Sequence, residues 1–349
     1  MTGTLFLSDA LTAYDGGGGA WPTAPSLFGR KGTLKASAGE ILRDFDAEGP
    51  VVACLPLSAT SCQTLRVQST VGRQVTQNDI SDALEAALGR AGAEGRAVVS
   101  AEPSRILLDG EEAKGSAVGK AAQSLEVEVT AFLSPLSLLA QLERVTKEAG
   151  MTLAGVLPLE EAAAASLRLA NEVSLPVILV DRWHTKIIAF RDEAPSRSSV
   201  FRVGAGHIEA DLAVTFGIPD DEAAKLARQM VLGRVQQGRE EASLVAVARL
   251  EELAQRTATI AKAAGIDASR VILLGLPIAP PVEEAFHAQG IAVQGPGLAL
   301  EKTDPAILAF AKGASMLAAG AIPRTAATAL HLSKPREKSG VLAWLRRNF

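Results

Sequence analysis

Two short segments of the chain combine an aspartate with a threonine a few residues later, each after a short apolar run. Asp9 and Thr12 form the first pair, and Asp181 and Thr185 form the second. In a β-hairpin of this kind the aspartate can orient a metal-bound water, while turn amides and the hydroxyl approach phosphate groups. The two segments are therefore candidate phosphate-binding hairpins.

Both turns lack glycine, which phosphate-binding turns normally contain. Leu11, Arg182, Trp183 and His184 stand where glycine would be expected. Glycine takes positive φ freely and, having no Cβ, lets a phosphate approach the backbone closely. Two ordinary β-turns with solvated aspartates therefore remain an alternative interpretation.

Other segments offer weaker signals for an anion or a ribose. Gly204 and Gly206 precede a predicted helix, whose first amides can point at an anion. Glu222 and Lys225 lie three residues apart on the next helix, where they could contact a ribose, as any surface pair at this spacing could. The tract at residues 16–19 has no following Lys-Ser/Thr, so it predicts a flexible loop and not a P-loop.

The residues that usually bind metals or act as nucleophiles are few and scattered. Cys54 and Cys62 are the only cysteines, which excludes a disulfide framework and fits a reducing compartment. No GxSxG nucleophile elbow is present. We expect no metal site, because the four histidines have no ligand-like spacing: His184, His207, His287 and His331.

Composition predicts a globular cytoplasmic protein. The chain has 349 residues, of which 48% are hydrophobic, enough for two domains or one large one. The net charge of −4 gives no general attraction to nucleic acid, so we expect none as a partner. The N-terminus lacks the basic residues of a secretory signal, and no run approaches the roughly 18 apolar residues that span a bilayer.

The elements that must position these residues alternate between strands and helices. We expect a long loop between strands at 4–8 and 51–57, and a turn after the strand at 271–274 that contains Gly275 and several prolines. The other expected strands are at 97–100, 104–108, 125–132, 175–180 and 186–191. The first expected helix begins at 76 and ends at Gly89 or Gly92. The other expected helices are at 137–149, 159–172, 207–216, 220–232, 240–264 and about 305–319.

The last ten residues predict a short amphipathic helix. The apolar side chains of this helix fall within an arc of roughly 160°, and Arg346 and Arg347 flank the opposite face. Residues 334–349 carry five Lys/Arg and one Glu, which favours anionic lipid. Such a helix would fold on meeting the membrane surface, although it could instead fill a protein groove. The apolar residues are Val341, Leu342, Trp344, Leu345 and Phe349.

The order and the amino-acid sequences of these segments resemble those of the bacterial cell-division protein FtsA, a family with an actin-like fold. The resemblance spans most of the chain and is best at 123–159 and 200–226. It implies a two-lobed α/β fold of ribonuclease-H-like subdomains, an inserted small α+β subdomain and a C-terminal membrane-targeting helix. It also implies ATP with Mg²⁺ as the possible cofactor.

Carried over to this chain, the resemblance assigns roles to the residues introduced above. It places Asp9 and Thr12 in the first phosphate loop and Asp181 and Thr185 in the second. It places Gly204 and Gly206 near the nucleotide, Glu222 and Lys225 at its ribose and base, and Gly275 in the adenosine turn.

The chain departs from the family pattern in the same places. Glycines are missing from both hairpins, and Gly275 is followed by Leu276 and Pro277 in place of a second glycine. We therefore expect ATP binding to be weakened or lost, and catalysis to be absent. The segment at 229–249 is short for the family, so one subdomain of the second lobe is expected to be reduced.

The implied organisation has seven parts. These are the first part of lobe 1 at 1–60, the inserted subdomain at 61–155, a connecting helix at 156–175, a reduced lobe 2 at 176–300, a return helix at 301–332, a linker at 333–339 and the membrane-targeting helix at 340–349.

The resemblance implies a scaffold that polymerises on the inner face of the cell membrane. Its expected partners are anionic lipid, further copies of the chain and a division protein such as the tubulin-like FtsZ. Polymerisation would multiply one weak anchor into many. Two alternatives share the fold: a PilM-like pilus-assembly adaptor that holds a peptide of a membrane protein beside the inserted subdomain, and an active actin-family ATPase.

Overall fold

The computed structural model describes residues 2–16, 21–91, 95–169, 174–191, 193–234 and 237–295, together with the helical residues Ala314 and Leu317. The predicted linker at 333–339 and membrane-targeting helix at 340–349 lie outside the described residues, as does the predicted return helix except for Ala314 and Leu317. Among the helices that are described, none combines the length and the apolar character needed to cross a bilayer.

The first lobe is built on a five-stranded sheet with the order β3-β2-β1-β4-β9. β1 pairs antiparallel with β2 and parallel with β4, and β4 pairs parallel with β9. The strands are β1 (Gly3–Leu7), β2 (Leu11–Asp15), β3 (Thr23–Pro25), β4 (Gly49–Cys54) and β9 (Met151–Leu157).

The second lobe repeats this connectivity in the order β12-β11-β10-β13-β14. β10 pairs antiparallel with β11 and parallel with β13, as β1 does with β2 and β4. Each lobe therefore begins with a β-hairpin whose turn lies at the end of its central strand. The strands are β10 (Val177–Val180), β11 (Thr185–Arg191), β12 (Ala194–Phe201), β13 (Arg270–Leu274) and β14 (Ala292–Gln294).

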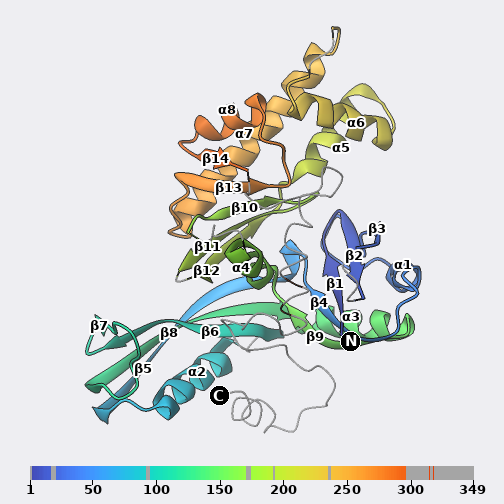
Figure 1. Ribbon diagram of the computed structural model, residues 1–349. Helices are drawn as coiled ribbons and strands as arrows, with labels where there is room; N and C mark the ends of the chain where they lie inside the picture. Colours follow the sequence, from blue (N-terminus) through green and yellow to red (C-terminus); the bar gives the residue numbers. More distant parts are fainter. Residues whose placement is uncertain are drawn as a thin grey trace.

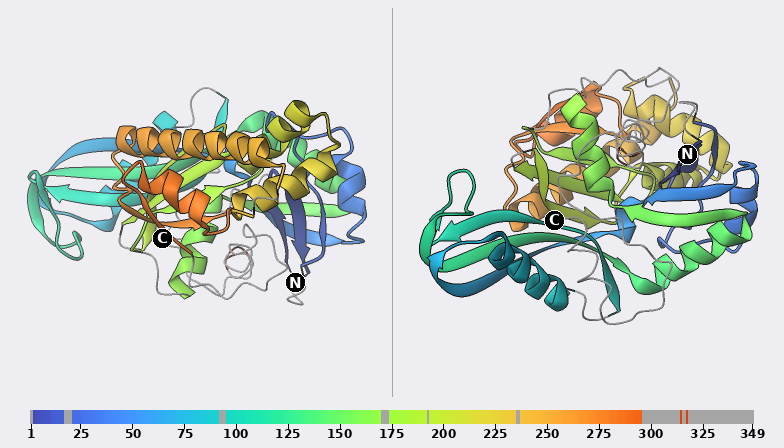
Figure 2. Two further views of the ribbon diagram at one scale, coloured as in Figure 1. Left: turned by 90° about the horizontal axis from the view of Figure 1, so that it is seen from above. Right: turned by 60° about the horizontal axis from the view of Figure 1, so that its bottom comes forward.

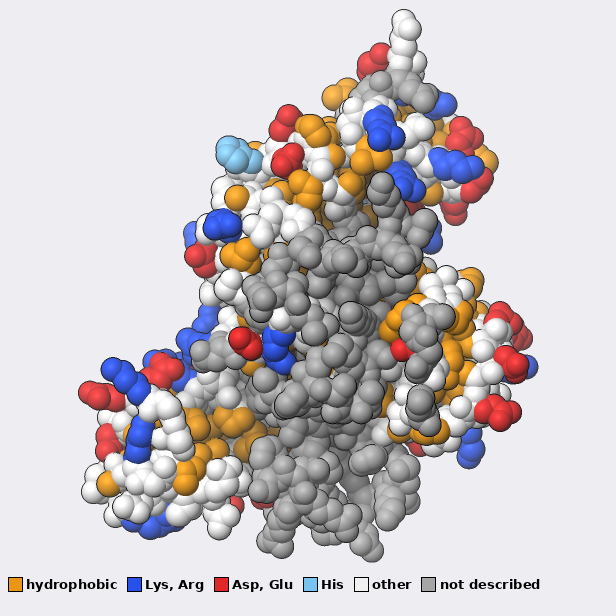
Figure 3. Space-filling model, viewed as in Figure 1, with side chains coloured by type: hydrophobic (Ala, Val, Ile, Leu, Met, Phe, Trp, Pro, Cys, Tyr) orange, Lys and Arg blue, Asp and Glu red, His pale blue; other side chains and the backbone are white. Residues whose placement is uncertain are grey.

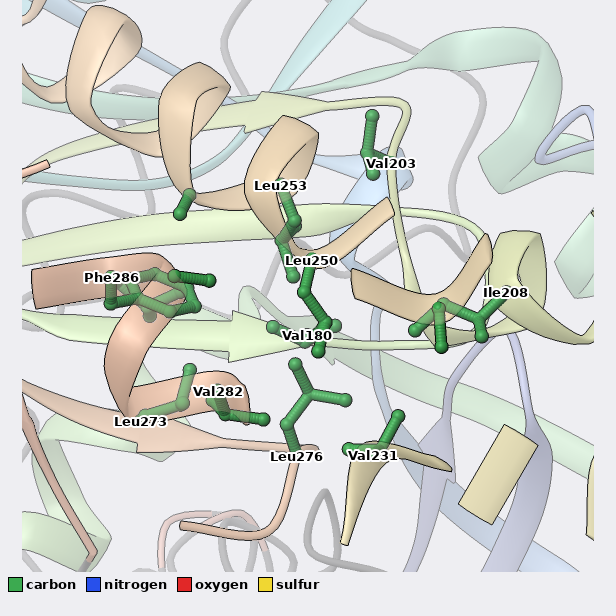
Figure 4. Close-up of a cluster of buried hydrophobic side chains, with 14 of the residues drawn as sticks. Val180, Val203, Ile208, Val231, Leu250, Leu253, Leu273, Leu276, Val282 and Phe286 are labelled. Carbon is green, nitrogen blue, oxygen red and sulfur yellow. The ribbon is translucent and has the colours of Figure 1, made fainter. Parts of the chain in front are cut away.

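Helices cover the outer face of each sheet, and Figure 1 shows those of the second lobe above its strands. α1 (Ala38–Arg43) and α3 (Leu136–Glu148) belong to the first lobe. In the second lobe, Val180, Leu250 and Phe286 meet in one buried cluster between the sheet and its helices (Figure 4). These helices are α5 (Ala205–Phe216), α6 (Asp220–Val231), α7 (Glu240–Ala263) and α8 (Pro280–His287).

The inner faces of the two sheets share a third layer, the connecting helix α4 (Leu159–Leu169). Phe6 of the first sheet and Leu179 of the second belong to one buried cluster with Ala162 and Ala163 of α4. Successive strand residues point to opposite faces, so both faces of each central strand are buried, which explains the unbroken apolar runs in the sequence. The small alanine side chains let α4 lie close to both sheets.

The inserted subdomain is a four-stranded antiparallel sheet, β5-β8-β6-β7, with α2 (Gln77–Ala91) packed on one face. Figure 2 shows that it extends away from the two lobes. The range predicted for this subdomain, 61–155, contains the whole sheet together with α3 and most of β9, a strand of the first lobe; the predicted boundaries stay a prediction. Its strands are β5 (Ser61–Gln74), β6 (Arg96–Leu108), β7 (Glu111–Glu112) and β8 (Ala121–Pro135).

Some elements differ from expectation. The long loop expected between the strands at 4–8 and 51–57 was wrong in part, because this segment contains β2, β3 and α1. Residues 97–108 form one strand, β6, and not two. The proline-containing turn after β13 leads directly into α8, because Pro280 and Pro281 occupy its first turn, where proline is tolerated.

Candidate functional site

The two predicted phosphate hairpins occupy equivalent places in the two lobes. Leu7 pairs with Thr12 at the end of the first hairpin, and Val180 pairs with Thr185 at the end of the second. Thr12 and Thr185 are therefore equivalent in register, and four residues separate the paired positions in each turn. By the same register Asp181 is equivalent to Ser8, so Asp9 lies one residue further into its turn.

The turns of the two hairpins contact each other directly. The backbone N–H of Asp9 donates to Oδ2 of Asp181 over 2.7 Å, and Nδ1 of His184 lies 2.6 Å from Oδ2 of Asp9. All three side chains are buried. An ionised carboxylate can only accept hydrogen bonds, so this contact requires the His184 tautomer with its proton on Nδ1 whenever Asp9 is ionised. The structure thus brings together the two aspartates that the sequence singled out.

Burial and the negative charge of Asp9 raise the pKa of Asp181 to about 7. The backbone N–H groups of Asp9 and Arg182 donate to the Asp181 carboxylate and oppose this rise. Among the described residues, Oδ1 of Asp9 has no hydrogen-bond partner, although it is buried. Two carboxylates thus share a buried site, and Asp181 is the one whose pKa is raised into the neutral range.

This arrangement predicts a pH dependence of stability. In the unfolded chain Asp181 titrates near 3.8, and in the folded protein near 7. Between these values the folded state holds a proton that the unfolded state has lost, so the free energy of unfolding falls as pH rises, by at most about 1.4 kcal/mol per pH unit, and levels off above pH 7.

The measurement is urea unfolding at pH 5 to 8 for the wild type and Asp181→Asn, a neutral side chain of the same shape. Other titrating groups cancel in the difference between the two proteins, so the wild type should show the steeper fall. If the free energies of unfolding of the two proteins changed equally with pH, the raised pKa of Asp181 would be contradicted, whatever the absolute stability of the variant.

The hydroxyls of both threonines are engaged within the protein. Oγ1 of Thr12 accepts a hydrogen bond from the N–H of Leu27 at 3.2 Å, and Oγ1 of Thr185 donates to the carbonyl of Val203 at 2.6 Å. Both threonines are fully buried. In this arrangement they tie each hairpin to the next segment of its own lobe.

The three predicted nucleotide glycines all lie against the second hairpin or the strand that leads into it. A Cβ on Gly204 would lie 2.7 Å from the carbonyl oxygen of Arg182, and one on Gly206 only 2.6 Å from Cγ of Arg182. Gly275 has a φ of +91°, and a Cβ there would overlap the carbonyl oxygen of Val180. Glycine is required at each position by protein packing alone.

Large side chains of the second turn, Arg182 and Trp183, lie against Gly206. The guanidinium of Arg182 pairs with Glu209 at 3.1 Å and lies 5.3 Å from the centre of the Trp183 ring. Arg30, from the first lobe, lies 4.8 Å from the same ring, and His207 meets it edge-on. Arg182 and Trp183 thus fill the approach that turn glycines would leave open.

Glu222 and Lys225 lie on the exposed side of α6. Lys225 is 3.9 Å from Asp221, with both side chains 79% exposed, and Glu222 is 4.0 Å from Arg239. The contacts of these two side chains are with neighbouring surface charges, which are weak. Their assignment to a ribose and base stays a prediction.

The resemblance implies ATP with Mg²⁺, and the hairpins in this arrangement do not fit the phosphates. The turn amide of Asp9 already binds Asp181, and the second turn presents Arg182 and Trp183 in place of a glycine cradle. In the described part of the chain, no three histidine, cysteine or acidic side chains gather as metal ligands would. Nucleotide binding by the predicted residues stays a prediction, and the arrangement of the two hairpins argues against it.

A second buried polar cluster was missed in the sequence. Nζ of Lys186 lies 2.6 Å from Glu160, and neither side chain has any exposed surface. Nζ also donates to the carbonyls of Leu57 and Thr60, and Oγ of Ser198 donates to Glu160. The cluster joins β11, α4 and the segment after β4. A lysine within an otherwise apolar strand was the signal that could have revealed it.

The same cluster affects the half-buried thiol of Cys62. Burial and the nearby charge of Glu160 raise the pKa of Cys62 to about 11, and burial raises that of Cys54 still further. Thiolates are the reactive form, so neither cysteine is activated.

Two cavities lie away from the hairpins, each about 430 Å³. The first lies between Glu128 of the inserted subdomain and Phe190, Arg191 and Arg197 of the second lobe. The second lies between α7 and α8. On the face drawn in Figure 3, basic and acidic side chains are interspersed over the described surface.

Comparison with known proteins identifies the fold. No protein-family model and no curated protein matches the sequence. A chain of the solved "PilM-PilN type IV pilus biogenesis complex" matches with a TM-score of 0.62 at 13% identity, over 91% of this chain and 98% of that one. The "MamK double helical filament" matches with a TM-score of 0.51 at 11% identity, over 92% and 100%. The expected actin-like, two-lobed α/β fold is thereby confirmed, while the likeness does not distinguish FtsA from other proteins of this fold.

Proposed function

We propose that this chain is an actin-like scaffold that binds protein partners at a membrane and does not turn over ATP. The observation that carries the proposal is the direct contact between the hairpins, where Asp9 binds Asp181 and His184. The similar structures support a role in assembly, since one is a chain of a pilus biogenesis complex and the other a filament. Similarity of fold alone is an analogy, so the site must be tested.

Titration with a fluorescent ATP analogue and Mg²⁺ tests the absence of an ATP site. We expect no saturable binding up to about 1 mM, which corresponds to a binding free energy weaker than about −4 kcal/mol. Saturable binding in the micromolar range, displaced by unlabelled ATP, would contradict the proposal and favour an active actin-family ATPase.

We further propose that the chain acts as FtsA-like proteins do, as a homopolymer held on the inner face of the membrane by residues 340–349, with a division protein of the FtsZ type as partner. The apolar face around Trp344 and Phe349 and the basic pair Arg346 and Arg347 support this role.

Deletion of residues 340–349 tests membrane attachment. We expect pelleting with anionic vesicles to fall at least about tenfold, because the segment supplies both the apolar and the basic contacts. Arg346→Ala/Arg347→Ala is the matched variant, and it should weaken pelleting with anionic vesicles while leaving any binding to neutral vesicles unchanged. Equal pelleting of the deleted and full-length chains would contradict this role.

A PilM-like adaptor is the second candidate function. Two observations favour it: the similarity to the PilM-PilN complex covers 98% of that chain, and a cavity lies beside the inserted subdomain, between Glu128 and Arg197. Affinity purification of the tagged chain from its own cells separates the two candidates, because pilus components would support the adaptor and FtsZ-type proteins the division scaffold.

A further inference from the structure

The contacts between the two hairpins are also contacts between the two lobes. Asp9 and Arg30 belong to the first lobe, and Asp181, Trp183 and His184 belong to the second. One backbone hydrogen bond, one imidazole–carboxylate pair and one cation–π contact join them, at 2.7, 2.6 and 4.8 Å. We refer to these five residues as the latch.

The centre of the latch is shielded from solvent. Asp9 is 2% exposed and His184 is 4% exposed, so water does not weaken their interaction as it does for surface ion pairs. Separating the lobes would leave the carboxylate of Asp9 without its imidazole partner. Oδ1 of Asp9 already lacks a hydrogen-bond partner among the described residues, so loss of the contact at Oδ2 would leave the buried carboxylate with neither oxygen satisfied by a side chain.

The side chains of the latch occupy the space between the turns. His184 is close enough to the first lobe that a Cβ on Gly32 would lie 3.9 Å from its Cε1 atom. The Trp183 ring contacts the guanidinium groups of both Arg30 of the first lobe and Arg182 of its own turn, at 4.8 and 5.3 Å from the ring centre. Turns made of glycine would leave this space for a ligand, whereas here protein groups cross it.

We propose that the latch holds the two lobes together without a ligand, so that the closed arrangement of this actin-like protein is independent of nucleotide. The inference goes beyond the proposed function, because it concerns the conformation of the lobes and holds for either class of partner. The buried ion pair of Lys186 and Glu160 is a second tie, which joins β11 of the second lobe to the connecting helix α4.

The test measures the distance between the lobes in the full-length chain. Spin labels on cysteines introduced at the exposed positions Glu40 and Glu283 report on α1 of the first lobe and α8 of the second. Cys62→Ser removes the half-buried native thiol from the labelling reaction. We expect one narrow distance distribution in the wild-type background, unchanged by ATP with Mg²⁺.

The variant Trp183→Gly/His184→Gly removes the two side chains that cross the space. We expect the proportion of open to closed molecules to rise about tenfold or more, as loss of hydrogen bonds to a buried charge predicts. Arg202→Ala, which removes an exposed arginine outside the latch, is the matched control and should leave the distribution unchanged. If the glycine variant does not fold, His184→Ala alone carries the same test with a smaller change.

Two results would overturn the latch. One is a folded latch variant, by circular dichroism, whose distances match the wild type, and the other is a wild-type distribution that narrows or shifts with ATP. Failure of the proposed function would look different. ATP that bound without changing the distance between the lobes would contradict a scaffold without an ATP site, but it would leave the latch proposal intact.

Discussion

Replacement of Lys186 with methionine should lower the free energy of unfolding by about 3–5 kcal/mol. Lys186 and Glu160 are 2.6 Å apart, and neither has any exposed surface. Removing the cation leaves the carboxylate of Glu160 buried without a countercharge, and the hydrogen bond from Ser198 does not replace it. The carbonyls of Leu57 and Thr60 also lose a donor.

Urea unfolding of three variants measures this effect. Lys186→Met/Glu160→Gln removes both charges, so it should recover a large part of the stability that the single variant loses, because the cost lies in the unpaired charge. Lys225→Met removes an exposed lysine whose partner is 3.9 Å away, and it should change stability by less than about 0.5 kcal/mol. A loss below about 1 kcal/mol for Lys186→Met would show that the pair is not buried as described.

Replacement of Gly275 with alanine should destabilise the protein by about 4 kcal/mol or abolish folding. The positive φ of +91° strains any residue with a Cβ, at about 1–3 kcal/mol. The new Cβ would also overlap the carbonyl of Val180, on a fully paired central strand that has little freedom to move. The two effects together exceed those of most single substitutions.

Gly290→Ala separates the two effects. Gly290 has a φ of +74° and open space around its Cβ position, so alanine there should cost only the conformational part, about 1–3 kcal/mol. Thermal unfolding of both variants and the yield of folded protein are the measurements. Equal destabilisation by the two substitutions would show that Gly275 is held by backbone conformation and not by contact with β10.

The elements predicted best are those whose signal is local. The strands β10 and β13 were predicted from unbroken runs of apolar residues. Such runs occur because both faces of these strands are buried. The helices α6 and α7 were predicted from apolar residues at helical spacing. In contrast, β5 is exposed along much of its length and alternates imperfectly, so it carried no clear periodicity.

The candidate site was predicted in part. The types and spacing of Asp9 and Asp181 identified the two hairpins, and the absence of glycine raised doubt about phosphate binding. The pairing of His184 with Asp9 joins residues 175 positions apart, and nothing local in the sequence indicates it. The pairing of Lys186 with Glu160 is also distant in sequence. Its one local signal is a lysine within a mostly apolar strand, which indicates a buried partner.

The pairing of β9 with β4 has a consequence for synthesis on the ribosome. Gly49 pairs with Met151, so the whole inserted subdomain is made after β4 and before its neighbour β9. During this interval the hydrogen-bonding edge of β4 that β9 will cover is open, and such edges invite aggregation. The inserted sheet and α2 are complete by then, because the sheet's strands, in the part of the chain that the structure describes, pair with one another and with no strand of either lobe. The inserted subdomain of the nascent chain can therefore be complete before β9 completes the sheet of the first lobe.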